Sequence, residues 1–390
     1  MKGTAWFWCC ATTLLGSPAA AQHLKVTTPL ASLEAAARRD SNDAEAHYQL
    51  ALAYWAKERF DDAERSLLTA IAIERRFAPA YLALAYLPYA RRPSLMQEEA
   101  KGRVPPEWRD PLQESWRLRR RAFLIDPLVD LRIIGAVVPV NEGIRLGRGG
   151  QVAINLDPFA AFVRGDYRFA FYAFNAFVAD LKNARRDSIS DGLLWYRGLS
   201  AGHVGEYDTA IADFTTLLGR GVTLEQADSV VRIPLHTNDY RYVLALFEYR
   251  ANRFGDAITL YQEALGNDVG LFLAHVQMGR IYEQHQMWPE AVDQFQRAVA
   301  VSPDDPSLLL DLGVVLREAG RLGEAEETLR QAMDANPRDS RVPYHLALTL
   351  QTEQQPTRAR EALTRFLALA PARYSRQIAD ANQRLKALGP

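Results

Sequence analysis

The sequence predicts an all-α solenoid built from helix-turn-helix repeats. A small residue returns every 34 residues in the second half of the chain, at Ala257, Ala291, Ala325 and Ala359. Thirty-four residues is the length of one helix-turn-helix repeat. A bulky apolar residue follows each alanine four places later, on the same face of a helix. These residues are Tyr261, Phe295, Leu329 and Leu363.

A large residue beside a small one precedes each alanine by twelve or thirteen residues. These pairs are Leu244-Ala245, Met278-Gly279, Leu312-Gly313 and Leu346-Ala347. A small residue where two helices cross lets their backbones approach, and large residues on either side fill the groove between helices. One helix pair cannot bury its apolar face alone, so successive pairs must stack into a solenoid with one concave surface.

A further small residue occurs in each of the first three repeats, and a proline ends each of the last three. The small residues are Ala264, Ala298 and Ala332, and the prolines are Pro303, Pro337 and Pro371. The pattern closely resembles the tetratricopeptide repeat (TPR) family. The resemblance implies a TPR α-solenoid, a right-handed superhelix whose first helices line a groove for a protein or peptide partner.

Residues 1–21 are predicted to be a cleavable signal peptide. Lys2 precedes an apolar stretch that is too short to span a bilayer. Ala19 and Ala21 suit signal peptidase, so the mature chain should begin at Gln22 and be exported to the periplasm or secreted. The cysteines, Cys9 and Cys10, both lie in this leader, so the mature chain should carry no thiol. No later run is apolar enough to predict a transmembrane segment.

Residues 22–43 are predicted to form a linker and a short helix that begins at Pro29, with Thr28 as its N-cap. Residues 44–127 should hold two TPR-like units. Pro88 should end the first helix of the second unit early, because proline lacks an amide donor. A polar segment at 91–111 then interrupts this unit. The remaining helices are expected near 44–57, 61–74 and 113–126.

Residues 128–165 fit no repeat and are predicted to be an irregular insertion that includes a short strand. Residues 166–237 should contain an aromatic helix at 166–181, a TPR-like unit at 191–218 and a connector with a helix near 224–231. Aromatic residues surround the first of these helices, so it should be buried, beneath the insertion, or form an interface. They are Phe169, Phe171, Tyr172, Phe174 and Phe177.

Four regular TPR units are predicted at 238–371, and a C-terminal capping helix within 372–390. Its apolar positions should cover the last open face of the array. They are Ile378, Ala381, Leu385 and Leu388.

Catalytic motifs are sparse. Residues 198–202 match the G-x-S-x-G elbow of α/β hydrolases, with Ser200 as the nucleophile. The elbow requires a strand before the serine, whereas this segment carries the first-helix pattern of a repeat. We therefore expect no catalytic residue here and no enzyme activity. The densest basic group should form a solvated helix face, with an anionic partner as the alternative. It comprises Arg117, Arg119, Arg120 and Arg121.

Charge and histidine spacing predict neither nucleic acid binding nor a bound metal or cofactor. The chain has 46 Lys and Arg residues against 47 Asp and Glu residues, so no overall field favours nucleic acid. The seven histidines include no pair at the spacing that places two imidazoles on one helical face.

The TPR resemblance places a partner-binding groove along the first helices of the repeats. Position by position it implies an apolar and aromatic lining with a few arginines. Either an apolar peptide or the chain's own insertion at 128–165 should occupy it, because a long apolar stripe is rarely left exposed. The lining residues are Tyr242, Leu246, Tyr249, Val276, Arg280, Leu310, Val314, Arg317, Tyr344 and Leu348.

Together these observations predict a non-catalytic scaffold or adaptor of the cell envelope that binds a protein or peptide. The alternative is an enzyme or a carbohydrate-binding or envelope-binding protein that uses the irregular region at 128–165. The partner's identity and the oligomeric state do not follow from the sequence.

Overall fold

The computed structural model describes residues 26–137, 144–146, 152–154, 158–183, 189–221 and 236–389. The predicted signal peptide and the predicted connector helix near 224–231 lie outside these residues. Over the described ranges the fold is the predicted all-α solenoid, with two short strands in addition. Within the same ranges, every helix is too short or too polar to cross a membrane.

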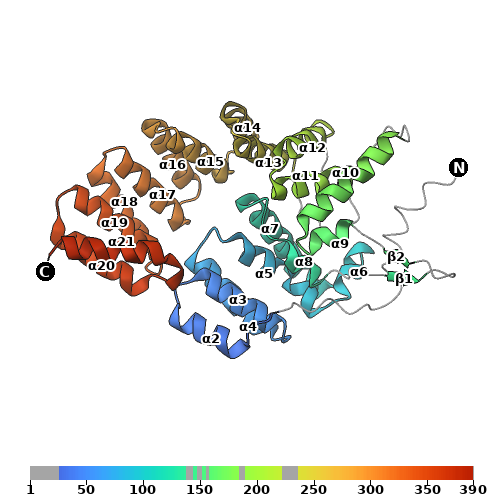
Figure 1. Cartoon of the computed structure of the whole chain (residues 1–390), viewed down its shortest axis with the longest axis horizontal. Helices are drawn as coiled ribbons and strands as arrows, with labels where there is room; N and C mark the ends of the chain where they lie inside the picture. The colour runs from blue at the N-terminus through green and yellow to red at the C-terminus, as the bar shows by residue number, and fades with distance from the viewer. Residues whose placement is uncertain are drawn as a thin grey trace. The chain divides into compact units, whose positions relative to one another are not determined.

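The described residues divide into two compact units. Unit 1 comprises Tyr81–Ala257, and unit 2 joins Val26–Ala80 to Ile258–Pro390. Unit 2 therefore combines the blue N-terminal helices of Figure 1 with its gold, orange and red C-terminal helices.

Helices occupy the predicted repeats at 238–371, and the four periodic alanines are fully buried. Within unit 2, α15 packs on α16, α17 on α18 and α19 on α20. Pro306 and Pro356 begin α17 and α20, where a missing amide donor costs nothing. The helices are α13 (Thr237–Arg250), α14 (Phe254–Asn267), α15 (Phe272–Gln284), α16 (Trp288–Val301), α17 (Pro306–Glu318), α18 (Leu322–Ala335), α19 (Arg341–Thr352) and α20 (Pro356–Leu369).

The capping helix is α21 (Ser375–Ala387), which follows the short 3-10 helix η4 (Ala372–Tyr374). Its predicted apolar positions pack against the cluster that α19 and α20 form. The final repeat is thereby covered, as the amphipathic pattern predicts.

The N-terminal part of unit 2 consists of α2 (Leu30–Arg39), α3 (Ala44–Trp55) and α4 (Phe60–Ile73). The predicted N-cap of α2 is wrong by one residue: Pro29, not Thr28, holds that position, without a side-chain hydrogen bond. Asp43 caps α3, since its carboxylate accepts a hydrogen bond from the Glu45 amide at 3.0 Å.

Pro88 does not end its helix, contrary to the prediction. Helix α5 (Ala78–Arg91) runs through it. Proline removes one amide donor from the helix, and the burial of Tyr86 and Tyr89 on either side offsets that loss. The polar segment at 91–111 is also partly helical, and the helix after it begins earlier than predicted. These elements are α6 (Leu95–Ala100), the 3-10 helix η2 (Pro106–Trp108) and α7 (Arg109–Ile125).

The insertion at 128–165 is more regular than predicted. It contains α8 (Arg132–Gly135), α9 (Pro158–Val163) and an antiparallel pair of strands, β1 (Ile144–Leu146) and β2 (Val152–Ile154). The helical turns form because their apolar residues are buried, among them Ile133, Ile134 and Phe162.

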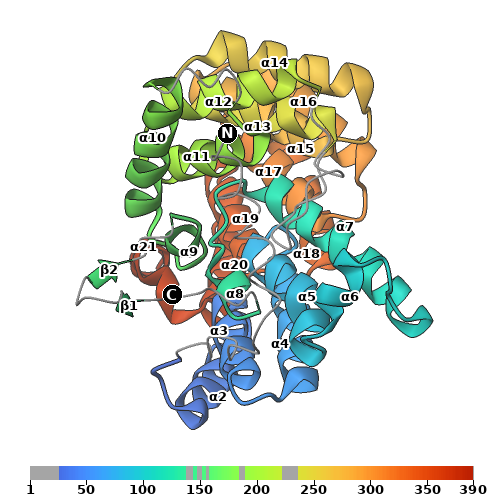
Figure 2. The ribbon, with the colours of Figure 1, turned by 90° about the vertical axis from the view of Figure 1, so that its right-hand side faces the viewer.

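The aromatic helix, α10 (Tyr167–Asn183), packs on α9 and on α11 (Asp191–Val204), which pairs with α12 (Tyr207–Gly219) (Figure 2). Only one side of α10 is buried. Phe171 and Phe174 face the core, whereas Tyr172 and Phe177 are 58% and 38% exposed. The prediction of burial beneath the insertion therefore holds for one face of this helix.

Candidate partner-binding surface

Four of the residues predicted to line the groove are buried in the helix packing instead, and the prediction is corrected for them. Tyr242 and Leu246 in unit 1 are 0% and 4% exposed. Val276 and Leu310 in unit 2 belong to the apolar clusters between repeats. One residue along a helix turns the side chain by about 100°. A small rotation of the helix therefore moves these positions from the groove into the core.

Tyr344, predicted to line the groove in the last repeat, instead contacts the capping helix α21. The Tyr344 hydroxyl donates a hydrogen bond to Asp380 of α21 at 2.8 Å, and its ring lies 5.0 Å from that of Phe366. Arg384 of α21 donates to Gln351 at 2.7 Å. Tyr344 therefore holds α21 in place, while Leu348 stays half-exposed beside it. In unit 1, Tyr249 is half-buried, with its ring 5.9 Å from Phe254.

A polar residue directly follows each of the predicted groove residues Val276, Leu310 and Tyr344. These polar residues, again 34 residues apart, are Gln277, Asp311 and His345. Burial, together with the positive charges of Arg317 and Arg341, lowers the pKa of His345 to about 4. Burial and the nearby charge of Asp311 raise the pKa of Glu283. Glu283 of α15, Asp311 and Arg317 of α17 and His345 of α19 therefore lie close enough to affect one another's charge.

We call the side of α15, α17 and α19 that carries these charged residues the first-helix face of unit 2. Arg280 on it is exposed, and Val314 and Arg317 are half-buried, so these three predicted groove residues do meet solvent. The face is charged rather than apolar, unlike the predicted lining. It comprises Arg280, Glu283, Asp311, Val314, Arg317 and His345.

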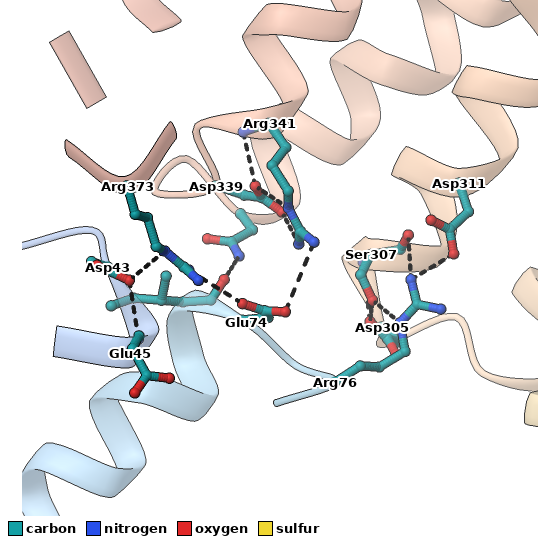
Figure 3. Close-up of polar contacts among 12 residues, drawn as sticks. Asp43, Glu45, Glu74, Arg76, Asp305, Ser307, Asp311, Asp339, Arg341 and Arg373 are labelled. Carbon is teal, nitrogen blue, oxygen red and sulfur yellow. Dashed lines mark hydrogen bonds and ion pairs between the residues drawn. The ribbon is translucent and has the colours of Figure 1, made fainter. Parts of the chain in front are cut away.

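One part of the first-helix face is occupied by the chain itself. Arg76, just after α4, reaches α17, where its Nε donates to the Ser307 hydroxyl at 2.8 Å (Figure 3). Its Nη2 donates to the Ser307 carbonyl at 3.2 Å and to the Asp311 carboxylate at 2.5 Å. Asp305 lies beside this contact and accepts hydrogen bonds from the Ser307 amide and hydroxyl.

More polar contacts extend this junction, which we call the closing seam; it joins residues 41–76 to residues 305–341 and Arg373. Asn336 donates to the Ile73 carbonyl at the end of α4 at 3.0 Å. Arg338 donates to Asn42 at 3.1 Å and also to the Ser41 carbonyl. Arg373 pairs with Asp43 at 2.8 Å and lies 3.7 Å from Glu74 (Figure 3). The seam thus consists of charges and hydrogen bonds.

The described parts of the 128–165 insertion pack inside unit 1. Phe159 and Phe162 make edge contacts with Tyr196 of α11, both at 5.2 Å between ring centres. A side chain at Gly202 of the same helix would collide with Leu128. The residue that covers part of α17 in unit 2 is instead Arg76, which no sequence pattern singled out. Its contacts span more than 230 residues, so neither a repeat nor a motif could reveal them.

The hydrolase-like motif has no catalytic geometry. Ser200 lies in the middle of α11, is fully buried, and donates its hydroxyl to the Tyr196 carbonyl at 2.7 Å. A nucleophile elbow needs an exposed serine on a sharp turn after a strand. Among the described residues no group of His, Cys, Asp and Glu is arranged to hold a metal ion.

The prediction of a solvated face for the arginine group on α7 is correct for Arg117 and Arg121, which are exposed, and wrong for Arg119 and Arg120. Arg119 is 1% exposed; it donates to the Tyr89 hydroxyl at 2.7 Å and lies over the rings of Tyr86 and Trp116. Arg120 forms a two-point ion pair with Asp239 of α13 at 2.6 and 2.7 Å. These contacts hold α7 inside unit 1, because a buried guanidinium requires partners.

Comparison with curated proteins finds short matches to large glycosyltransferases. A stretch of 99 residues is 28% identical to the probable UDP-N-acetylglucosamine–peptide N-acetylglucosaminyltransferase SPINDLY of Petunia hybrida, and covers 25% of this chain but 11% of that protein. A stretch of 119 residues is 29% identical to its counterpart in Hordeum vulgare, covering 30% and 12%. The matches therefore span a small part of these relatives.

Solved structures with similarity include the C-terminal part of a TPR repeat-containing protein from Cytophaga hutchinsonii. It is 16% identical, with a TM-score of 0.46 over 58% of this chain and 84% of that one. A crystal structure of MamA is 17% identical, with a TM-score of 0.39 over 46% and 96%.

The tetratricopeptide repeat family model matches residues 25–80, 197–270 and 276–340, which together make up half of the chain. These ranges include α2 to α4, α12 to α14 and α16 to α18, with parts of α11 and α15, and the small residues of these repeats lie at the helix crossings. Repeats of this kind serve as surfaces for protein–protein interaction. This chain belongs to the tetratricopeptide repeat family.

Proposed function

We propose that this protein is a non-catalytic scaffold that binds a partner protein or peptide along the first-helix face of α15 and α17. The observation that carries the proposal is the exposure of Arg280 next to half-exposed Val314 and Arg317. Stacked repeats place such residues in a row, so that one extended segment of a partner can contact successive helices. The mixture of charged and apolar side chains suits a specific protein surface.

We further propose that the scaffold works outside the cytoplasm, in the cell envelope or as a secreted protein. The support is the leader-like sequence at 1–21 and the confinement of both cysteines to it. A fold that lacks thiols is unaffected by an oxidising compartment.

Charge reversal on the first-helix face tests the binding proposal. The mature chain, immobilised, is used to capture partners from envelope extracts. We expect Arg280→Glu to weaken capture by about tenfold, which corresponds to about 1.4 kcal/mol.

The matched control is Arg297→Glu. Arg297 is exposed on α16, the second helix of the same repeat, and its ion-pair partner there is Asp293. Equal capture by wild type and Arg280→Glu would place the partner site elsewhere. Equal loss in both variants would mean that net charge alone drives binding.

The N-terminus of the extracytoplasmic protein tests export. Mass spectrometry should find Gln22 as its first residue. Soluble protein that retains Met1 in the cytoplasm would contradict the proposal.

A further inference from the structure

Arg76 comes from outside the C-terminal repeats and binds to α17 through its guanidinium group. Its Nε and Nη2 reach the Ser307 hydroxyl, the Ser307 carbonyl and the Asp311 carboxylate, three oxygens that surround the edge of one guanidinium (Figure 3). We call these three oxygens, with Asp305 behind them, the Arg76 seat. Ser307 and Asp311 are four residues apart, so they share one face of α17.

The seat matches a guanidinium better than an ammonium. A planar fork donates to several oxygens at once, whereas a lysine side chain offers one compact charge. Asp305 is 3% exposed, and its Oδ2 has no protein hydrogen-bond partner among the described residues. The Nη1 of Arg76 likewise has no such partner within those ranges. The seat thus holds more acceptor capacity than Arg76 uses.

The seat can exchange its occupant because polar contacts hold Arg76 there. The two apolar clusters around Phe295 and Phe366 contain residues of the C-terminal repeats and none from residues 26–80. The closing seam consists of ion pairs and hydrogen bonds, whose donors and acceptors water or a competing polar group can also satisfy.

We infer that the Arg76 seat is the anchor point for a partner, which presents an arginine side chain to Asp311 and Ser307 in place of Arg76. The inference rests on the proposed function, since the seat lies on the first-helix face. While the closing seam is intact, Arg76 occupies the anchor point. A partner that docks along α15 and α17 displaces it and opens the seam locally.

Chemical rescue of an emptied seat tests its selectivity. The Arg76→Ala variant of the mature chain is heated with about 10 mM ethylguanidinium or, as the matched cation, about 10 mM ethylammonium. Ethylguanidinium should raise the melting temperature of this variant by about 2–4 °C. Ethylammonium should not, and wild type, whose seat is filled, should respond to neither. Arg76→Ala combined with Asp311→Asn should lose the response.

Wild-type protein provides a test that needs no substitution. A penta-arginine peptide should speed hydrogen exchange at residues 73–77 at least about threefold more than a penta-lysine peptide of equal charge. Equal effects of the two peptides would overturn the inference. So would equal rescue by both cations, or rescue that persists in the double variant.

The outcomes separate this inference from the proposed function. Partner capture that Arg280→Glu weakens would uphold the scaffold even if the seat shows no preference for guanidinium. A selective seat together with capture that Arg280→Glu leaves unchanged would uphold the seat and overturn the first-helix face of α15 as the partner site.

Discussion

At the scale of single residues, two histidines are held neutral by their surroundings. His203 of α11 stacks on Tyr167 at 3.5 Å between ring centres, with the rings nearly parallel. Burial lowers the pKa of His203 to about 4, as it does for His345 in unit 2. In the unfolded chain a histidine has a pKa near 6.5. Protonation therefore favours the unfolded state.

Replacing His203 tests this effect. As the pH falls from about 7 to about 5, the unfolded state binds protons that the folded state does not, so each such histidine should cost about 1–2 kcal/mol of stability. His203→Phe keeps the stack on Tyr167 and should remove that share of the loss, as measured by urea unfolding at both pH values. His285→Phe, at an exposed position, is the control. An unchanged pH dependence in His203→Phe would show that His203 is accessible to protons in the folded state.

At the scale of elements, the helix pairs are set by close crossings at glycine. A Cβ atom on Gly313 of α17 would lie 2.6 Å from a side-chain carbon of Leu329 on α18, and one on Gly279 of α15 would lie 2.9 Å from Phe295 on α16. Each glycine precedes its large partner by the same number of residues. The repeated spacing of small and large residues in the sequence therefore reflects contacts between the two helices of each pair.

Gly313→Ala should destabilise the array although alanine favours helices. The added methyl group forces α17 and α18 apart, at a cost of about 1–3 kcal/mol, which exceeds the gain in helix propensity of about 1 kcal/mol. Gly266→Ala in α14, where a Cβ would meet no atom within 4 Å, is the matched control and should be neutral or stabilising. Thermal unfolding measures both variants. Equal melting temperatures for the two would mean that α17 and α18 can separate without cost.

At the scale of the whole molecule, unit 2 brings the N-terminal repeat to the C-terminal repeats through the closing seam. Arg76, Asn336, Arg338 and Arg373 supply its donors. Partly exposed ion pairs are screened by salt, whereas the apolar contacts between successive repeats are not.

Salt should therefore loosen the N-terminal repeat selectively. Between about 0.1 M and about 1 M NaCl, hydrogen exchange in α3 and α4 should become about two- to fivefold faster, as expected for the loss of up to about 1 kcal/mol. Exchange in α15 and α16, which apolar packing stabilises, is the internal control. Uniform exchange rates at both salt concentrations would show that the seam does not depend on charge.

The sequence by itself determined the repeats. Each helix pair contacts its neighbours in the chain. The spacing of small and large residues was therefore enough to predict the helices at 238–371, the first repeat at 44–74 and the capping helix. A few local features were missed because burial outweighed a local preference. Pro88 stays within α5, and the insertion at 128–165 forms short helices over buried isoleucines.

Only the tertiary structure decided which surface of the repeats is open. The side chains of adjacent positions on a helix point about 100° apart. Two adjacent positions recur with the same 34-residue period, so the period alone does not tell which of them faces the core. The packing therefore had to place Leu310 in the core and Asp311 on the surface. The seat of Arg76 depends on polar groups that are distant in the chain and follow no period. Such contacts form only once the solenoid has brought the N-terminal repeat to α17, and no local pattern of residues encodes them.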